Sequence, residues 1–219
     1  PTPTPFDSKT TVTAESILGD LQEEIIATST FVQADVQIIG NGLYLTDAAS
    51  FNVTSPGQEL LKVITTECDD VADLPTQCKN GYVTKVKNSE ANEDDYYVKF
   101  VGENGRDGPG TWEECPKPSR KITFDKGTMP IQIIRAKANT FVVKQIVWED
   151  CLVGDTVTVP EPSFIGKAIN KMLFFRNRLV MLSDENVIMS QPGDFFNFWP
   201  KSAITYTASD VIDLSCSSE

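Results

Sequence analysis

The sequence predicts a mainly β fold with a minor helical part (α+β), in which a domain built as a meander of antiparallel strands precedes the start of a β-propeller. Three observations lead to this prediction. Apolar residues recur with a period of two from Tyr82 onward, turn-forming segments separate these runs, and clear helical spacing occurs only near the N-terminus. With 219 residues, 40% of them hydrophobic, the chain is long enough for one large domain or two small ones with a buried core.

The first predicted element is an amphipathic helix over about residues 14–27. Thr13 is the expected N-cap, and Glu15 lies in the first turn. The apolar positions of this segment have helical spacing. They are Ala14, Ile17, Leu18, Leu21 and Ile25.

A hairpin is predicted directly after the helix. Residues 31–39 and 43–46 flank Gly40-Asn41-Gly42, which supplies the positive-φ positions of a tight turn. The next apolar segment, residues 58–65, has an ambiguous period, and we favour a short helix there over a strand.

Strands with one wetter face are predicted from Tyr82 onward. They cover residues 83–87 and 96–101, with Tyr96, Val98 and Phe100 on one face. The charged segment 88–95 and the glycine-rich segment 102–110 are expected to be the turns of a meander. Residues 131–134 and 140–148 extend the pattern around a turn at 137–139.

Pro160-Glu161-Pro162 breaks the strand pattern, and we expect a domain boundary there. Residues 1–160 are then a β-rich domain with one amphipathic helix. Residues 161–219 hold two strands within 171–182, a turn at 183–186, a strand at 187–189 and an aromatic-rich corner, which resemble the first blade region of a β-propeller. A propeller needs several blades, and the sequence begins with a proline-rich stretch instead of Met, so we expect a piece of a longer protein.

Composition excludes several classes of function. The chain has no histidine, so a Ser-His-Asp triad, a His-ligated metal and a histidine pH switch are impossible. Its net charge of −12 argues against binding DNA or an anionic membrane, because both reward clustered cations. An acidic wall that DNA passes without sticking remains compatible with this charge.

The charge is unevenly distributed along the chain. Residues 1–110 carry 7 basic and 18 acidic side chains, whereas residues 111–219 carry 12 and 13. The stretch 163–183 contains no acid but four cations, which form either a local basic patch or a set of subunit-interface residues that meet the acidic half of a neighbouring copy. These cations are Lys167, Lys171, Arg176 and Arg178.

The adjacent acids and the segment that resembles a calcium loop are explained more simply by structure than by a functional site. Adjacent acids recur, but neighbours in a strand point to opposite faces, so a two-carboxylate site would need a cross-strand pair such as Asp95 with Glu113. The segment from Glu103 to Glu114 mimics a calcium loop, but Gly105 occupies a ligand position, which favours a hairpin turn. We therefore predict no catalytic residues and no metal site.

Two further motifs give equally little support for a functional site. Gly40-x-Gly42 lacks the third glycine of a dinucleotide-binding fingerprint, so we predict no cofactor. The five cysteines have no C-x-x-C spacing, and free thiols in a reducing cell are favoured, although a Cys68–Cys78 pair stays open.

Several uncommon aromatic strings appear in a fixed order along the chain. They include Phe174-Phe-Arg-Asn-Arg-Leu179 and Gly193-Asp-Phe-Phe-Asn-Phe198, preceded by Asp95-Tyr-Tyr-Val-Lys-Phe100 and Lys126-Gly-Thr-Met-Pro130. Together they strongly resemble the nozzle protein family, also called tail tubular protein B, of short-tailed bacteriophages. The resemblance covers most of residues 60–205.

The resemblance implies a structural component of the virion tail, made in the host bacterial cytoplasm. It implies a hexameric ring below the tail adaptor (tail tubular protein A), in contact with tail fibres, through which genomic DNA leaves without sequence-specific binding. It also implies a β-propeller with added β-rich domains, so that residues 1–160 are a platform-like domain. No small-molecule substrate is expected.

Two alternatives of other classes stay open. The first is a virion-associated carbohydrate-active hydrolase that uses paired carboxylates. The second is a sugar-binding module, which requires exposed aromatic side chains such as Trp112, Trp148 or Trp199.

Overall fold

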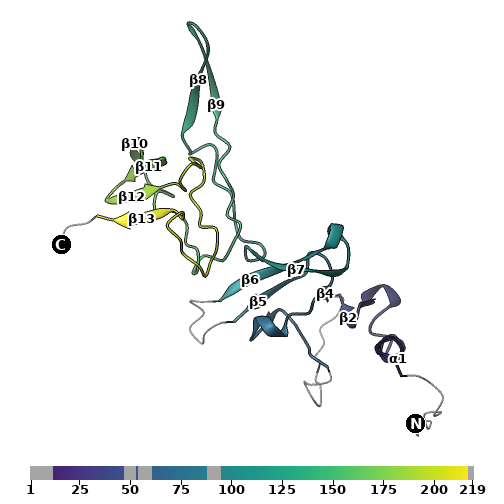
Figure 1. Ribbon diagram of the computed structural model, residues 1–219. Coiled ribbons are helices and arrows are strands. Elements are labelled where there is room, and N and C mark those ends of the chain that lie inside the picture. Colours follow the sequence, from purple (N-terminus) through teal and green to yellow (C-terminus); the bar gives the residue numbers. More distant parts are fainter. Residues whose placement is uncertain (1–11, 47–52, 54–60, 88–94, 217–219) are drawn as a thin grey trace. The chain divides into compact units, whose positions relative to one another are not determined.

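The computed structural model describes residues 12–46, 53, 61–87 and 95–216 (Figure 1). Within these ranges the chain forms one α-helix, three short 3₁₀ helices and thirteen β-strands. The mainly β prediction with a minor helical part is therefore confirmed. No helix in the described ranges has the length and apolarity needed to cross a membrane.

The chain divides into two compact units that interleave along the sequence. The described residues of the first unit fall in Pro1–Thr66, Val71–Tyr82 and Lys99–Glu113, and those of the second fall in Glu67–Asp70, Val83–Val98 and Glu114–Glu219. The division at 160/161 rests on the sequence pattern and stays a prediction for the complete protein.

Helix α1 (Ala14–Ala27) of the first unit begins and ends as predicted. The Thr13 hydroxyl accepts a hydrogen bond from the Ser16 N–H at 3.2 Å, while the Thr13 N–H donates to the Ser16 hydroxyl at 3.1 Å. This reciprocal cap satisfies two backbone donors at the helix start. Leu18 is buried, and Gln22 Nε2 donates to the Val36 carbonyl at 2.6 Å. These two side chains place α1 on the hairpin that follows.

That hairpin consists of β1 (Val36–Ile39) and β2 (Gly42–Leu45), joined at Gly40, whose φ is +56°. The predicted turn is confirmed, but the first strand is shorter than expected because Gln33–Asp35 form a 3₁₀ turn. The predicted helix at 58–65 is wrong for residues 61–65, which form neither helix nor strand. Residues 58–60 lie outside the described ranges.

A five-stranded sheet has the order β3-β5-β6-β7-β4. Along β6, Tyr96, Val98 and Phe100 are buried while the residues between them are more exposed, so the predicted alternation is confirmed. The predicted loop at 88–94 lies outside the described ranges. The strands are β3 (Glu67–Cys68), β4 (Gln77–Cys78), β5 (Val83–Val86), β6 (Tyr96–Gly102) and β7 (Gly108–Cys115).

The segment from Glu103 to Glu114 is a turn followed by a strand, as predicted. A 3₁₀ turn at Glu103–Gly105 reverses the chain between β6 and β7, with Asn104 and Gly105 at φ of 55° and 70°. The residues of the supposed calcium loop are thus used to close a hairpin.

Gly110 on β7 is required by a close approach. A Cβ at this position would lie 2.3 Å from the Val101 carbonyl oxygen and 2.7 Å from Phe100 Cζ. We expect Gly110→Ala to lower the free energy of unfolding of the first unit by about 1–3 kcal/mol, as overpacking does. Gly19→Ala is the matched control, because nothing lies within 4 Å of its Cβ position in α1 and alanine favours a helix. Equal thermal stability of the two variants would contradict this prediction.

The second unit is organised around an aromatic core. Phe124 stacks on Trp199 with ring centroids 5.0 Å apart and packs edge-on against Trp148 at 6.4 Å. Phe164 and Phe198 complete the cluster, 5.4 Å from each other. All five side chains are buried.

Six strands of the second unit follow each other in two separate sheets (Figure 1). A two-stranded hairpin is formed by β8 (Ile131–Lys137) and β9 (Thr140–Gln145). The predicted extension of the second strand to residue 148 is wrong, because the strand ends at Gln145 and the side chains of Ile146 and Trp148 are buried. The second sheet is an antiparallel meander in the order β10-β11-β12-β13. Its strands are β10 (Ile169–Phe175), β11 (Arg178–Ser183), β12 (Asn186–Met189) and β13 (Ile212–Ser215).

The β10–β13 sheet matches the predicted strands and turns in residues 171–189. Four antiparallel strands in sequence order are the unit from which propeller blades are built. One such sheet is not a propeller, so the propeller stays a proposal.

Candidate subunit interface

The four predicted interface cations lie on or beside β10, at the edge of the β10–β13 sheet. Lys167 precedes the strand, Lys171 lies on it, and Arg176 lies in the turn that follows. These three side chains are exposed, whereas Arg178 at the start of β11 is 8% exposed. The structure thus divides the set into three surface cations and one buried cation.

The β10–β11 turn explains why two arginines two positions apart have different environments. Phe175 pairs with Arg178, leaving a two-residue loop in which Arg176 and Asn177 have φ of 45° and 60°. Two consecutive positive φ values are the signature of the type I′ turn that suits the twist of a hairpin. The turn directs Arg176 over the exposed Phe175 ring, 5.4 Å from its centroid.

Arg178 holds segments of the second unit together through hydrogen bonds. Its guanidinium donates to the carbonyls of Ser190 and Asp210, both at 2.6 Å, and to the Ala208 carbonyl at 2.9 Å. One side chain therefore joins β11 to two segments that are distant in sequence. For a contact with a neighbouring copy, the predicted set is left with Lys167, Lys171 and Arg176.

Lys167 has a partner within the chain. Its ammonium lies 3.5 Å from Asp184, and the two side chains are 43% and 56% exposed. A solvent-exposed pair of this kind contributes about 0–1 kcal/mol, so it can exchange partners at little cost.

The outer strand β10 also exposes large apolar side chains. Phe174 is 70% exposed, although its ring contacts Phe195 at 5.2 Å, and Phe175 is 50% exposed. Met172–Phe175 is an apolar run without alternation, which is typical of a strand covered on both faces, but this pattern does not show whether the cover comes from the same chain or from a partner. We call Lys171–Arg176 the β10 surface.

Asp210 holds the segment that receives Arg178. Its carboxylate accepts hydrogen bonds from the Thr207 N–H at 2.6 Å and the Lys201 N–H at 3.3 Å. Burial of the carboxyl raises its pKa, but the hydrogen bonds from Thr207 and Lys201 together outweigh that effect and leave the pKa below the ordinary 3.8.

This lowered pKa predicts an acid-sensitive contribution to stability. A carboxyl whose pKa is lower in the folded state stabilises the fold fully above its unfolded value and loses that contribution as the pH falls through the folded value. At neutral pH we expect Asp210→Asn to lower the free energy of unfolding of the second unit by about 1–3 kcal/mol. The difference from the unsubstituted protein should shrink once the pH is well below 3.8. Denaturant unfolding across this range measures it, and a difference independent of pH would contradict the assigned role of the charge.

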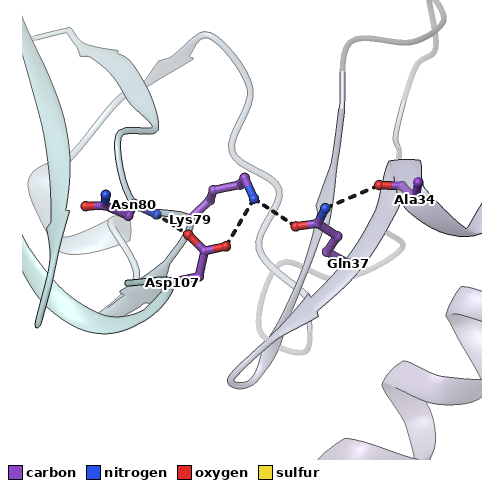
Figure 2. A network of polar contacts seen from close by, with 5 residues as sticks. All are labelled: Ala34, Gln37, Lys79, Asn80 and Asp107. Atoms are coloured by element: carbon purple, nitrogen blue, oxygen red, sulfur yellow. Dashed lines mark hydrogen bonds and ion pairs between the residues drawn. The ribbon is translucent and has the colours of Figure 1, made fainter. Parts of the chain in front are cut away.

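The first unit contains a polar network around Lys79 (Figure 2). The Lys79 ammonium donates to Gln37 Oε1 at 2.9 Å and pairs with Asp107 at 3.0 Å, while the Asn80 N–H donates to the same Asp107 carboxylate at 2.9 Å. The Asn80 hydrogen bond, helped by Lys79, lowers the pKa of Asp107. Gln37 Nε2 also donates to the Ala34 carbonyl at 3.2 Å. The network fastens β1 to the segment after β4 and has a structural role.

The acidic side chains considered for a two-carboxylate hydrolase site lie in different environments. Asp95 is buried and paired with Lys85 at 2.5 Å. Glu114 accepts hydrogen bonds from the Ser202 hydroxyl at 2.6 Å and the Ala203 N–H at 2.7 Å, while Glu113 is exposed. Among the described residues, no group of three or more acids and cysteines is placed to hold a metal ion.

The cysteines and tryptophans have structural environments. None of the five cysteines, all of which lie in the described ranges, forms a disulfide bond, so the Cys68–Cys78 disulfide is not formed. Trp148 and Trp199 are buried. Trp112 is half-buried against Phe100 and donates its indole N–H to the Pro75 carbonyl at 2.8 Å. None of the three presents the exposed face that a sugar-binding platform needs.

A strand-rich chain with an aromatic core and exposed, cationic edge strands has the features of a protein that assembles with others. The family model of the bacteriophage nozzle proteins matches residues 2–219, so the chain belongs to that family. It is also similar to the tail tubular protein gp12 of Escherichia phage T7, with 34% identity over 160 residues. The match covers 73% of this chain and 20% of that relative's length, so the chain spans about a fifth of it.

Membership of the family assigns the chain to the phage tail. It is a structural protein of the virion tail. The resemblance seen in the aromatic strings is thereby confirmed.

Proposed function

We propose that the chain forms part of a hexameric nozzle ring through which the phage genome passes into the host, and that it acts without enzymatic activity. The observation that carries this proposal is membership of the nozzle family over residues 2–219. The proposed ring lies below the tail adaptor, tail tubular protein A, and contacts the tail fibres. In this proposal the β10–β13 sheet is the first blade of a β-propeller.

The acidic charge of the chain supports a conduit. With a net charge of −12, its surface repels phosphates, and a wall that repels phosphates does not hold DNA during transit. Residues 1–110, which carry most of the excess acid, are the proposed source of this repulsion.

The β10 surface and Lys167 are proposed to meet acidic residues of the next copy in the ring. Ring contacts are heterologous, so a cationic patch on one copy faces a different patch on its neighbour. Arg178 is excluded from this contact because its guanidinium is used within the chain.

The proposed conduit is tested by imaging purified tails by electron microscopy and counting the copies of this chain around the tail axis. Six copies lining a central channel are the expected result. A single peripheral copy, or copies that line no channel, would overturn the proposal.

The cationic contact is tested by charge reversal. We expect Lys171→Glu with Arg176→Glu to reduce the yield of assembled rings at least tenfold, because both reversed charges would face acids. The control is Lys121→Glu with Lys126→Glu, which makes the same change in charge at two exposed positions outside the β10 surface. Equal ring yields for the two double variants, measured by sedimentation, would refute the contact.

A further inference from the structure

The β8–β9 hairpin exposes an apolar face. The register pairs Ile133 with Val143 and Arg135 with Phe141, and paired residues in an antiparallel hairpin point to the same side. On this face Ile131, Ile133, Phe141 and Val143 are 54%, 66%, 64% and 61% exposed. We call these four residues, together with Arg135, the hairpin face.

Apolar side chains exposed in this way indicate a binding partner that covers them. A two-stranded hairpin is marginally stable in water by itself, and contiguous exposed apolar side chains mark interaction sites. Every residue of β9 is exposed, as is every residue of β8 except Gln132, so no described part of the chain covers the hairpin (Figure 1).

The positive charge of the hairpin indicates what kind of partner it binds. Residues 131–145 carry Arg135, Lys137 and Lys144 and no acid. The partner should therefore combine apolar side chains with carboxylates. Nucleic acid satisfies only half of this requirement, because phosphates would pair with the cations but would leave the four apolar side chains uncovered.

Helix α1 has the complementary composition. Its fourteen residues contain four acids and no cation. Ile17 and Leu21 are 48% and 37% exposed, one helical turn apart, and Asp20 and Glu24 lie three residues after each of them. One side of α1 is thus apolar and acidic where the hairpin face is apolar and basic.

We propose that the hairpin face of one copy docks on helix α1 of a second copy of this chain. Ile133, Phe141 and Val143 cover Ile17 and Leu21, and Arg135 pairs with Asp20 or Glu24. The proposal rests on the ring of the proposed function, because head-to-tail contacts in a ring join two different patches of identical copies. It adds to the cationic β10 contact a second, mainly apolar one.

Cysteine cross-linking in purified tails tests this contact. The tails carry Phe141→Cys and Ile17→Cys together with Cys216→Ser, because the native Cys216 is exposed. Mild oxidation is expected to give a ladder of cross-linked multiples of the chain on a non-reducing gel. The control replaces Ile17→Cys by Val71→Cys, a first-unit position of similar exposure at 51%, and is expected to give no ladder.

Charge exchange provides a second readout that does not depend on cysteines. Arg135→Glu is expected to reduce the yield of assembled tails at least tenfold, and adding Asp20→Lys to the same chain is expected to restore it. Failure of this restoration would count against the contact even where the cysteine variants do not assemble.

Each other result of the cross-linking overturns the proposal. A cross-linked species with the mass of one chain would place the hairpin on its own α1. A product containing a different tail protein would identify that protein as the occupant. Six-fold rings without any cross-link would remove the docking contact while leaving the proposed conduit intact, whereas the absence of rings in unsubstituted tails would overturn the conduit itself.

Discussion

Replacing Arg178 by alanine is expected to lower the free energy of unfolding of the second unit by about 3–5 kcal/mol. The guanidinium serves the carbonyls of Ser190, Ala208 and Asp210, at 2.6–2.9 Å. Ser190 and Asp210 are buried, and each buried acceptor left without a donor costs about 1–3 kcal/mol. Hydrogen exchange of the Val180 and Met181 amides in the same strand, β11, reports the loss, because both residues are buried.

Arg176→Ala is the matched control for this substitution. It removes the same side chain two positions earlier, from an exposed site where the guanidinium lies over the Phe175 ring. Its effect on stability should stay within about 0.5 kcal/mol. If the two alanine variants were equally stable, the hydrogen bonds of the buried Arg178 side chain would not stabilise the second unit as predicted.

Phe124→Ala is expected to destabilise the second unit by a similar amount, about 3–5 kcal/mol. Its ring is 7% exposed, stacks on Trp199 and contacts Phe164 at 5.6 Å, so truncation leaves a cavity lined by large aromatic side chains. Thermal unfolding followed by tryptophan fluorescence measures the effect directly, because two of the three tryptophans lie beside the cavity.

Tyr206→Ala separates this packing effect from the general loss of an aromatic ring. Tyr206 is 74% exposed in the same unit, so its removal should change the unfolding temperature by no more than about one or two degrees. A Phe124→Ala variant as stable as Tyr206→Ala would show that the cluster contributes little to the fold.

The features that depend on neighbours in sequence were predictable. Helix α1 has its predicted bounds because Thr13, a local cap, and a short-range apolar period determine them. The alternation along β6 followed from the sequence for the same reason, since adjacent residues of a strand face opposite sides.

The features that depend on distant segments were not predictable. Arg176 and Arg178 look alike in sequence, and two of the three carbonyls that bind the buried Arg178 come from Ala208 and Asp210, about thirty residues away. The exposure of Phe174 could not be foreseen either, because an apolar strand has the same pattern whether its cover comes from its own chain or from a partner.

The buried thiols have a consequence for the life of the particle outside the cell. Cys151 is fully buried, its Sγ–H donates to the Val153 carbonyl at 3.3 Å, and burial raises its pKa. Burial likewise raises the pKa of Cys78. Because the thiolate is the species that oxidants attack, these residues resist oxidation. Among the cysteines of this chain, oxidation in aerated water should therefore reach the exposed Cys216 first.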